Sequence, residues 1–175
     1  LPGINKTNAR FDERKMQFIN TQYIRSMPLE TFCWFSRPYL EEKQALPEGV
    51  SEDYYQKVMG ICQEKVRSIE DLPEFIRYFF FDDYPKDEKT WQKISKKGDP
   101  LERVREFLSA RSQLAAWDEA SLEALVQQLS EANGVGTGDY IHAIRYAVSG
   151  QGVGPSFYGL LAVLGEERSV NRMNV

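Results

Sequence analysis

The spacing of apolar residues along the chain predicts helices nearly throughout. Met16, Ile19 and Tyr23 recur three or four positions apart and so share one face of a helix expected over residues 12–25. Further helices are predicted after Pro28, with a kink or early end at Pro38, from Ser51 to about Arg67, from Ser68 onward, and over about 87–97, 100–115, 118–133, 139–149 and 155–164. No segment alternates apolar and polar residues between turn signals, as a strand would. The predicted fold class is all-α.

A charged, proline-bearing segment separates these helices into two groups. Asp82-Asp83-Tyr84-Pro85-Lys86-Asp87 lies between two helical patterns and has the composition of a link. The length of 175 residues suits one large domain or two small ones with connected cores. We therefore predict two consecutive helical lobes, residues 1–81 and residues 82–175.

The bulk composition is that of a globular protein. Hydrophobic residues make up 42% and charged residues 27% of the chain. No apolar run approaches the roughly 20 residues of a membrane-spanning helix, and Leu1–Lys6 shows no targeting signal, so a cytoplasmic protein is expected. The net charge of −4 disfavours RNA binding, because phosphate contacts usually leave a basic surface. An RNA-binding protein of this charge must gather its basic and acidic residues on opposite faces.

The residue types needed for catalysis or metal binding are sparse. Cys33 and Cys62 lie in helical patterns without Cys-x-x-Cys spacing, which favours buried free thiols in a reducing cytosol over a disulfide or zinc. His142 is the only histidine, which excludes most histidine-based metal sites and proton relays. Adjacent carboxylates such as Glu41-Glu42 do not converge on a helix surface. We predict no catalytic residue, no metal and no cofactor in this chain.

Two glycine-rich loops invite a phosphate-binding interpretation. Residues 134–138 lack the Gly-Lys-Ser/Thr ending of a P-loop, and residues 150–155 follow a helix rather than the strand of a dinucleotide fold. Both are better interpreted as turns between helices. Their backbone N–H groups at a helix N-terminus remain natural phosphate contacts, to which Pro155 adds no donor.

The predicted helix over residues 140–150 has the pattern most typical of RNA contact. Ile141, Ile144 and Val148 form its apolar stripe, and a neighbouring polar face is expected to carry His142, Arg145, Tyr146 and Ser149. The planar fork of Arg145 suits base edges or phosphates. Tyr146 and the nearby Phe157 offer rings on which unpaired bases stack. The alternative interpretation is an ordinary surface arginine beside core aromatic residues.

Four groups of residues, spread over about 160 positions, form the most specific pattern in the chain. They are Phe11-Asp12-x-x-Lys15-Met16-x-x-x-Asn20-x-x-Tyr23-Ile24-Arg25; Leu72-Pro73-x-x-x-Arg77-Tyr78-Phe79-Phe80 with Asp83-Tyr84-Pro85; His142-x-x-Arg145-x-Ala147-x-Ser149-Gly150; and Gly154-Pro155-Ser156 with Leu160-Leu161-x-x-Leu164-Gly165-x-x-x-x-x-x-Arg172. In this order they resemble the C-terminal region of bacterial-type glutamyl-tRNA synthetases.

The resemblance implies a helical cage that grips the anticodon of tRNA. In that family the cage follows a class I catalytic domain, whose two ATP-site signatures are absent from this sequence. The chain is therefore expected to be the non-catalytic part of a glutamate–tRNA ligase, monomeric on its own. The full-length parent would use ATP and Mg²⁺ to activate glutamate and transfer it to tRNA(Glu).

The resemblance also assigns residues to the anticodon. Arg145 falls on the arginine that reads the first anticodon base, and Pro155 and Phe157 fall where the family's chain lies against splayed bases. A second family arginine discriminates the third base, but Lys65 stands there, with Arg67 two residues on. Lysine lacks the bidentate fork, which leaves acceptance of tRNA(Gln) open. Arg67 would lie about 200° round the same predicted helix.

Two other classes of function are weighed against anticodon recognition. A helical protein-interaction module that has kept a synthetase-derived fold would bind no RNA and would expose an apolar patch. A small helical enzyme is the third class, but the sequence supplies no catalytic set for it.

Overall fold

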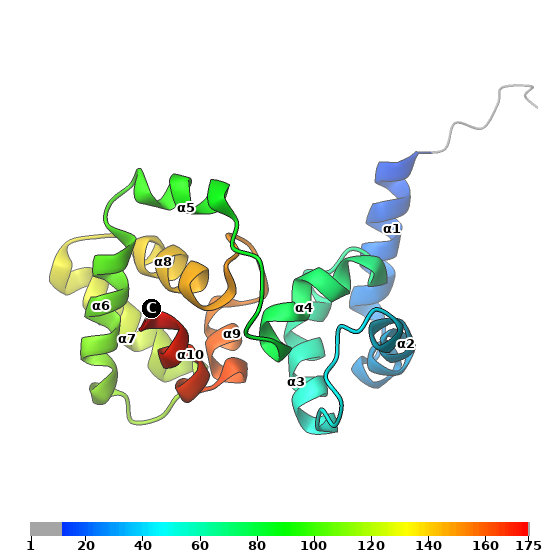
Figure 1. The fold of residues 1–175 in the computed structure, drawn as a ribbon. Helices are drawn as coiled ribbons and strands as arrows, with labels where there is room; N and C mark the ends of the chain where they lie inside the picture. Colours follow the sequence, from blue (N-terminus) through cyan, green and yellow to red (C-terminus); the bar gives the residue numbers. More distant parts are fainter. Residues whose placement is uncertain (1–11, 175) are drawn as a thin grey trace, which may run out of the picture.

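The computed structural model describes residues 12–174, which form ten α-helices, two short 3-10 helices and no strand (Figure 1). The α-helices are α1 (Glu13–Ser26), α2 (Leu29–Glu42), α3 (Glu52–Gln63), α4 (Leu72–Phe80), α5 (Glu88–Ser95), α6 (Pro100–Ala110), α7 (Glu119–Asn133), α8 (Thr137–Ser149), α9 (Phe157–Leu164) and α10 (Glu166–Met173). The 3-10 helices are Ile69–Asp71 and Arg111–Gln113. The predicted all-α fold is confirmed. Residues 1–11, which include Phe11 and Leu1–Lys6, and Val175 lie outside the described residues.

Most of the helices begin at a side chain that caps the first turn. Asp12 accepts a hydrogen bond from the backbone N–H of Lys15, and Ser51 accepts one from Tyr54. Asp87, Asp99, Asp118 and Ser156 cap α5, α6, α7 and α9 in the same way. These oxygens satisfy N–H groups that have no partner within the helix, which explains why the chain enters a helix at each position.

Several helices differ from the prediction. Helix α6 ends at Ala110 rather than near residue 115, because residues 111–113 form a 3-10 helix. Helix α2 continues past Pro38 to Glu42, because Leu40 beyond the proline is fully buried and holds the last turn. Helix α3 ends at Gln63 rather than near Arg67, and the next residues form a turn. Helix α10 was not predicted.

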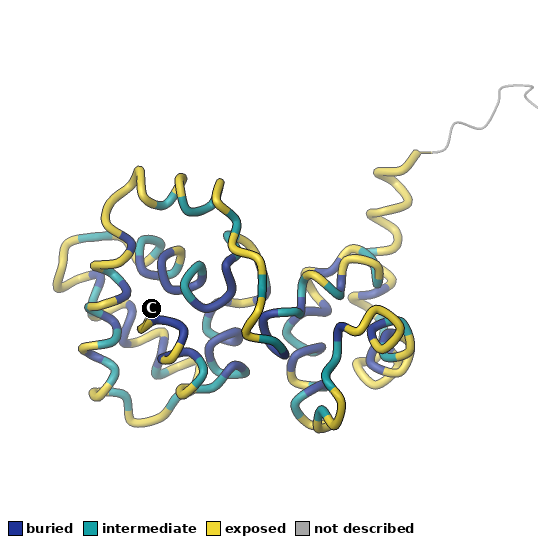
Figure 2. Tube along the Cα trace, viewed as in Figure 1, coloured by how far each residue is buried: buried dark blue, intermediate teal, exposed yellow. Residues whose placement is uncertain are grey.

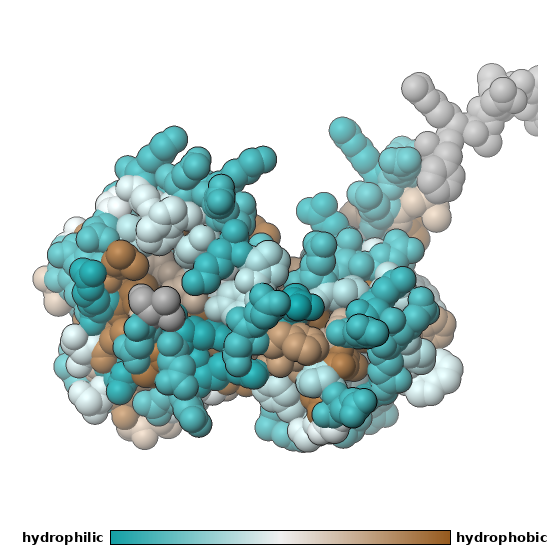
Figure 3. Space-filling view, in the orientation of Figure 1, coloured by the Kyte–Doolittle hydropathy of each residue, from teal (hydrophilic) through white to brown (hydrophobic). Residues whose placement is uncertain are grey.

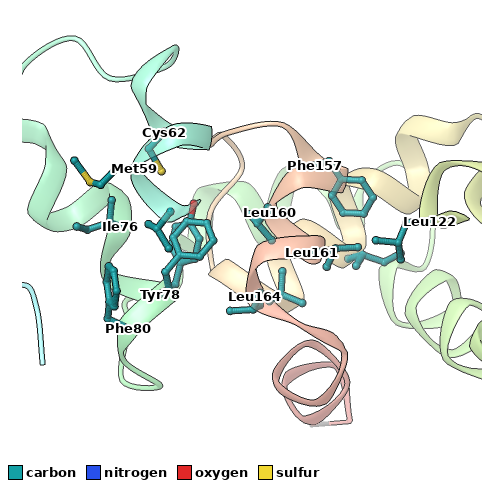
Figure 4. Packing of buried hydrophobic residues seen from close by; sticks show 14 of the residues in the cluster. Met59, Cys62, Ile76, Tyr78, Phe80, Leu122, Phe157, Leu160, Leu161 and Leu164 are labelled. Carbon is teal, nitrogen blue, oxygen red and sulfur yellow. The ribbon is translucent and has the colours of Figure 1, made fainter. Parts of the chain in front are cut away.

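The helices form two groups joined by a continuous core. Helices α1–α4 lie on one side and α5–α10 on the other, with α2 packed on α3 and α6 on α8 (Figure 1). Buried residues run through the junction between the groups (Figure 2). There Cys62 and Tyr78 of the first group face Leu160 and Leu164 of α9 (Figure 4). The two groups therefore share one hydrophobic core, and the division into separate lobes at residues 81 and 82 stays a prediction.

Arg172 ties the link after α4 to the second group. Its Nη1 donates to the carbonyl of Val148 at 2.7 Å, and its Nη2 donates to the carbonyl of Phe81 at 3.0 Å and to the Asp82 carboxylate at 2.7 Å. The guanidinium also lies 4.6 Å from the ring centroid of Tyr84. The hydrogen bond from Arg172 lowers the pKa of Asp82. This network fixes where the chain enters the second group.

The apolar face of α1 is largely uncovered. Met16, Ile19 and Tyr23 share a face as predicted, yet they are 49%, 50% and 67% exposed. Only Ile24 of this helix is buried. The helical periodicity of α1 was thus predicted correctly. Its apolar face, however, does not pack against the described residues.

Cys33 and Cys62 are both buried and unbonded, as predicted. Burial raises the pKa of the Cys33 thiol to about 11 and raises that of Cys62 as well. Between residues 12 and 174, no helix combines the length and the hydropathy needed to cross a membrane.

Candidate nucleic-acid interface

Helix α8 is central to the second group and is buried on more than its apolar stripe. It packs against α5, α6, α7 and α10, so neighbours cover several of its faces. Ile144 and Val148 are fully buried as expected, but Ser149 and Arg145 are buried too, Arg145 to 8% exposure. The prediction that this polar face is exposed to solvent is therefore wrong for Arg145 and Ser149. Helical spacing indicated which side chains share one face of α8, but it did not show that neighbouring elements cover that face.

The guanidinium of Arg145 is held inside the protein with one donor unused. Its Nη2 donates to the carbonyl of Pro155 at 3.0 Å, and its Cζ lies 5.7 Å from the ring centroid of Phe157. Its Nη1 is buried without a hydrogen-bond partner among residues 12–174, and no carboxylate in that range pairs with it. Burial lowers the pKa of Arg145. A buried cationic donor without a partner is costly, typically by about 1–3 kcal/mol, which singles out this position.

Tyr78 of α4 approaches the same place from the other group. A Cβ placed on Gly154 would lie 2.9 Å from Nη1 of Arg145 and 3.4 Å from the hydroxyl of Tyr78. The Tyr78 hydroxyl is also buried without a partner in the described part of the chain, and burial raises its pKa. Glycine at 154 thus leaves room for two polar groups that converge on the loop between α8 and α9. Tyr78 belongs to a motif noted in the sequence, but nothing there indicated this contact.

Pro155 and Phe157 come next to Arg145 as the resemblance implied, but both are buried. The Phe157 ring packs at 5.0 Å against Tyr158, nearly edge-on, and lies under the Arg145 guanidinium. It therefore presents no free face to a base in this conformation. Stacking on Phe157 would require the loop over residues 150–156 to move.

Tyr146 and His142 lie further along α8. The Tyr146 ring is half-buried against Trp91 of α5, with centroids 5.3 Å apart and planes tilted by 33°. His142 is exposed. Trp91 had no predicted role, although its position on an amphipathic segment indicated that it would pack against a neighbour.

Lys65 and Arg67 lie in the first group, in the turn after α3, and both are exposed. The turn is fastened by α1: Asn20 Nδ2 donates to the carbonyl of Arg67 and Arg25 Nε to that of Glu64, each at 2.7 Å. The expected separation of about 200° is wrong, because neither residue is helical. No hydrogen bond or ion pair between described residues joins them to Arg145.

Comparison with known proteins shows to which family this chain belongs. A family model described as an anticodon binding domain matches residues 31–175. The chain belongs to the anticodon binding domain family.

The similar proteins are glutamate–tRNA ligases, and this anticodon binding domain is homologous to their C-terminal part. It is 33% identical over 174 residues to the glutamate–tRNA ligase of Methylacidiphilum infernorum, and 29% identical over 174 residues to that of Elusimicrobium minutum. These alignments cover 99% of this chain but only 39% and 36% of the two relatives. A crystal structure of a glutamate tRNA ligase from Elizabethkingia meningosepticum aligns with a TM-score of 0.77 and 25% identity, covering 98% of this chain and 33% of that one.

Within residues 12–174, no group of three or more His, Cys, Asp or Glu side chains is arranged to hold a metal ion. The notable groups of this anticodon binding domain are hydrogen-bond donors: the fork of Arg145 and the exposed Lys65 and Arg67. Such donors recognise base edges and phosphates.

Proposed function

We propose that this domain recognises the anticodon of tRNA(Glu) as part of a glutamate–tRNA ligase. The observation that carries the proposal is the buried Nη1 of Arg145, which lacks a partner among the described residues beside the Gly154–Pro155 turn. A base edge that accepts from this nitrogen would remove the cost of an unpaired buried donor. Because that relief depends on where the base carries its acceptors, it discriminates between bases.

Recognition in this scheme requires the loop over residues 150–156 to shift. Arg145 and Phe157 are covered by this loop, so an unstacked base reaches them only when the Pro155 carbonyl releases Nη2. The base would then accept from the guanidinium fork and stack on the uncovered Phe157 ring, as single-stranded RNA recognition generally requires. His142 and Tyr146 would line the approach along α8.

The finer assignments follow from the same proposal. Lys65, with Arg67 beside it, would meet another anticodon base at the exposed turn after α3, and its single-point donor leaves tRNA(Gln) as a possible second partner. ATP and Mg²⁺ would serve a catalytic part that the relatives carry outside the region matched here. The domain itself would act as a monomer that selects and positions the tRNA.

The test is binding of an RNA hairpin that carries the glutamate anticodon loop, measured by fluorescence anisotropy. Arg145→Ala is expected to weaken binding by about 1–3 kcal/mol and to make the domain less sensitive to a change of the first anticodon base. Arg105→Ala is the matched control, because Arg105 is an exposed arginine on α6 that forms no ion pair within residues 12–174. Equal affinity of wild type and Arg145→Ala for every loop would refute the proposed role.

A second candidate, a protein-interaction module, is supported by one observation. Besides the exposed apolar side chains of α1, Trp34 and Phe35 of α2 are 74% and 57% exposed. The same hairpin assay separates the two functions: a protein-interaction module would bind no hairpin even at low salt, where phosphate contacts are strongest.

A further inference from the structure

A pocket of about 280 Å³ lies between α5, the start of α6, α8 and the loop after α8. Helix α5 crosses over α8 and forms one wall (Figure 1). This helix has no buried residue and is attached mainly at its start, where the Asp87 N–H donates to the Gly150 carbonyl at 2.8 Å, and through Trp91. Because α5 is attached at few points, space remains between this helix and α8, and this space is the pocket.

The wall formed by α5 is basic although the chain is acidic. The segment over residues 86–97 contains five lysines and only two carboxylates, against a net charge of −4 for the whole chain. Hydrophilic side chains gather over this helix (Figure 3). Two of the lysines line the pocket: Lys93 from α5 and Lys97 from the turn that follows it. An acidic RNA-binding protein requires such a local cluster of basic residues.

Lys93 and Lys97 are free to meet a ligand. Neither forms an ion pair within residues 12–174, whereas Arg103, the other lining cation, is paired with Glu102 and Glu106 at 2.5 and 2.9 Å. The Asp99 carboxylate at the pocket edge is used to cap α6. The lining thus carries three cations and three carboxylates, and of these six only Lys93, Lys97 and Asp139 have side chains without a hydrogen-bond or ion-pair partner among the described residues.

The electrostatic environment of His142 reflects the two lysines of the pocket. Its pKa is lowered first by partial burial and then by the positive charges of Lys97, Arg145 and Lys93, while Asp139 acts in the opposite direction. Of these cations, Lys93 and Lys97 line the pocket, so an anionic group placed beside their two ammonium groups would be stabilised.

The interior of the pocket suits a flat ring. Ile94, Val135, Ala143 and Val153 supply apolar lining, and the carboxylate of Asp139 can accept a hydrogen bond from an amino group. The volume of about 280 Å³ lies just below the range of about 300–1,000 Å³ for small-molecule sites, so it accommodates one ring system and little more. An apolar slot flanked by two ammonium groups matches a nucleotide, which joins a flat base to a phosphate.

We propose that the pocket between α5 and α8 binds one unpaired nucleotide of RNA, with its base in the apolar slot and its backbone phosphates against Lys93 and Lys97. The inference rests on the proposed function in taking RNA as the ligand. It adds a second site that holds the strand without reading the base that Arg145 reads. Lysine contacts to phosphate strengthen binding for every sequence, whereas Arg145 acts on one base.

The first experiment compares a pocket variant with a control of equal charge. Binding of single-stranded oligouridylate and of anticodon hairpins is measured over a series of salt concentrations for wild type, Lys93→Gln/Lys97→Gln and Lys89→Gln/Lys96→Gln. The control removes two exposed lysines of the same segment that do not line the pocket. Each phosphate contact on a single strand contributes about 0.7 to the slope of log K against log salt, so the pocket variant should lose about 1.4 in slope. Its affinity should fall by the same factor for every loop sequence. The control should lose less than half as much slope.

The second experiment examines the slot itself. Uridine monophosphate and inorganic phosphate are titrated into the protein while the NMR signals of Ala143 and Val135 are followed. We expect uridine monophosphate to bind at least about tenfold more tightly than phosphate, about 1.4 kcal/mol, and to shift both signals only in proteins that keep Lys93 and Lys97.

Equal slopes for the two double variants, or equal binding of phosphate and uridine monophosphate, would overturn the pocket assignment. These outcomes are independent of anticodon recognition. If the pocket results hold while Arg145→Ala leaves hairpin binding unchanged, the nucleotide site stands and the proposed anticodon role falls.

Discussion

Replacing Arg145 with methionine separates its role in the core from its proposed role in recognition. Methionine has a similar length and fills a buried site without a charge or a donor. The variant loses the hydrogen bond to the Pro155 carbonyl, which as a charged-donor bond contributes about 1.5–3 kcal/mol, and the contact with the Phe157 ring, which contributes about 0.5–2 kcal/mol. It also removes the unpaired Nη1, whose burial costs about 1–3 kcal/mol.

These contributions partly offset one another. We expect the free energy of unfolding to fall by about 1–2 kcal/mol, and by no more than about 4 kcal/mol when the losses are largest and the gain is smallest. For a chain of this size, the upper bound lowers Tm by about 8–16 °C. Discrimination at the first anticodon base should nevertheless disappear, a loss of about 1–3 kcal/mol in the hairpin assay. Calorimetry and anisotropy on the same preparation measure the two effects.

Tyr78→Phe is the companion variant. It deletes the neighbouring unpaired hydroxyl and should leave both stability and hairpin discrimination at or slightly above the wild-type level. A fall in Tm well beyond about 16 °C for Arg145→Met would refute the reasoning. Arg145 would then be a structural residue whose burial has no connection with RNA, and its effect on binding would be indirect.

Two further predictions concern the connections around α8. Gly150→Ala should destabilise the protein by about 2–5 kcal/mol in urea unfolding, because Gly150 has φ +70° and the added Cβ would lie 2.6 Å from the Pro85 carbonyl oxygen. Gly134→Ala is the control, because Gly134 has a similar φ of +64° but open space around it. This variant should lose only about 1–2 kcal/mol of stability. Equal costs would contradict this account of the link. Asp82, whose pKa is lowered by Arg172, stabilises the fold above the ordinary aspartate pKa of about 3.9, and this contribution is lost as pH falls through the lower folded-state value. Asp82→Asn should therefore flatten the dependence of Tm on pH below about pH 4, and parallel curves for the two proteins would show that the ion pair is ineffective.

Local signals in the sequence predicted the helices well. Asp12 and Ser51 start helices as capping residues, and Gly134 ends α7 with φ +64°. These features depend on hydrogen bonds within a few residues, which a sequence pattern records directly. The end of α3 could not be predicted, because the side chains that fasten the following turn, Asn20 and Arg25, come from a distant helix.

The environment of the candidate site could not be predicted from the sequence. Periodicity placed Arg145 on a polar face, but its burial depends on Tyr78 of α4, which is distant in sequence, and on the loop that brings the Pro155 carbonyl to it. The same limit applies to Tyr23, whose helical face was predicted and whose exposure was not. The lysines over residues 86–97 are visible in the sequence, but the overall charge of −4 conceals them because it averages over the whole chain.

The apolar contact between α4 and α9 has a consequence for how the molecule can adapt to a partner. Tyr78, Leu160 and their neighbours exclude water between the two helix groups, so a hinge motion there would have to expose a close-packed interior. Accommodation of a bound molecule is therefore restricted to the parts that this interior does not hold: the loop over residues 150–156 and the lightly attached α5. The spacing between the turn that carries Lys65 and helix α8 is set before any partner arrives.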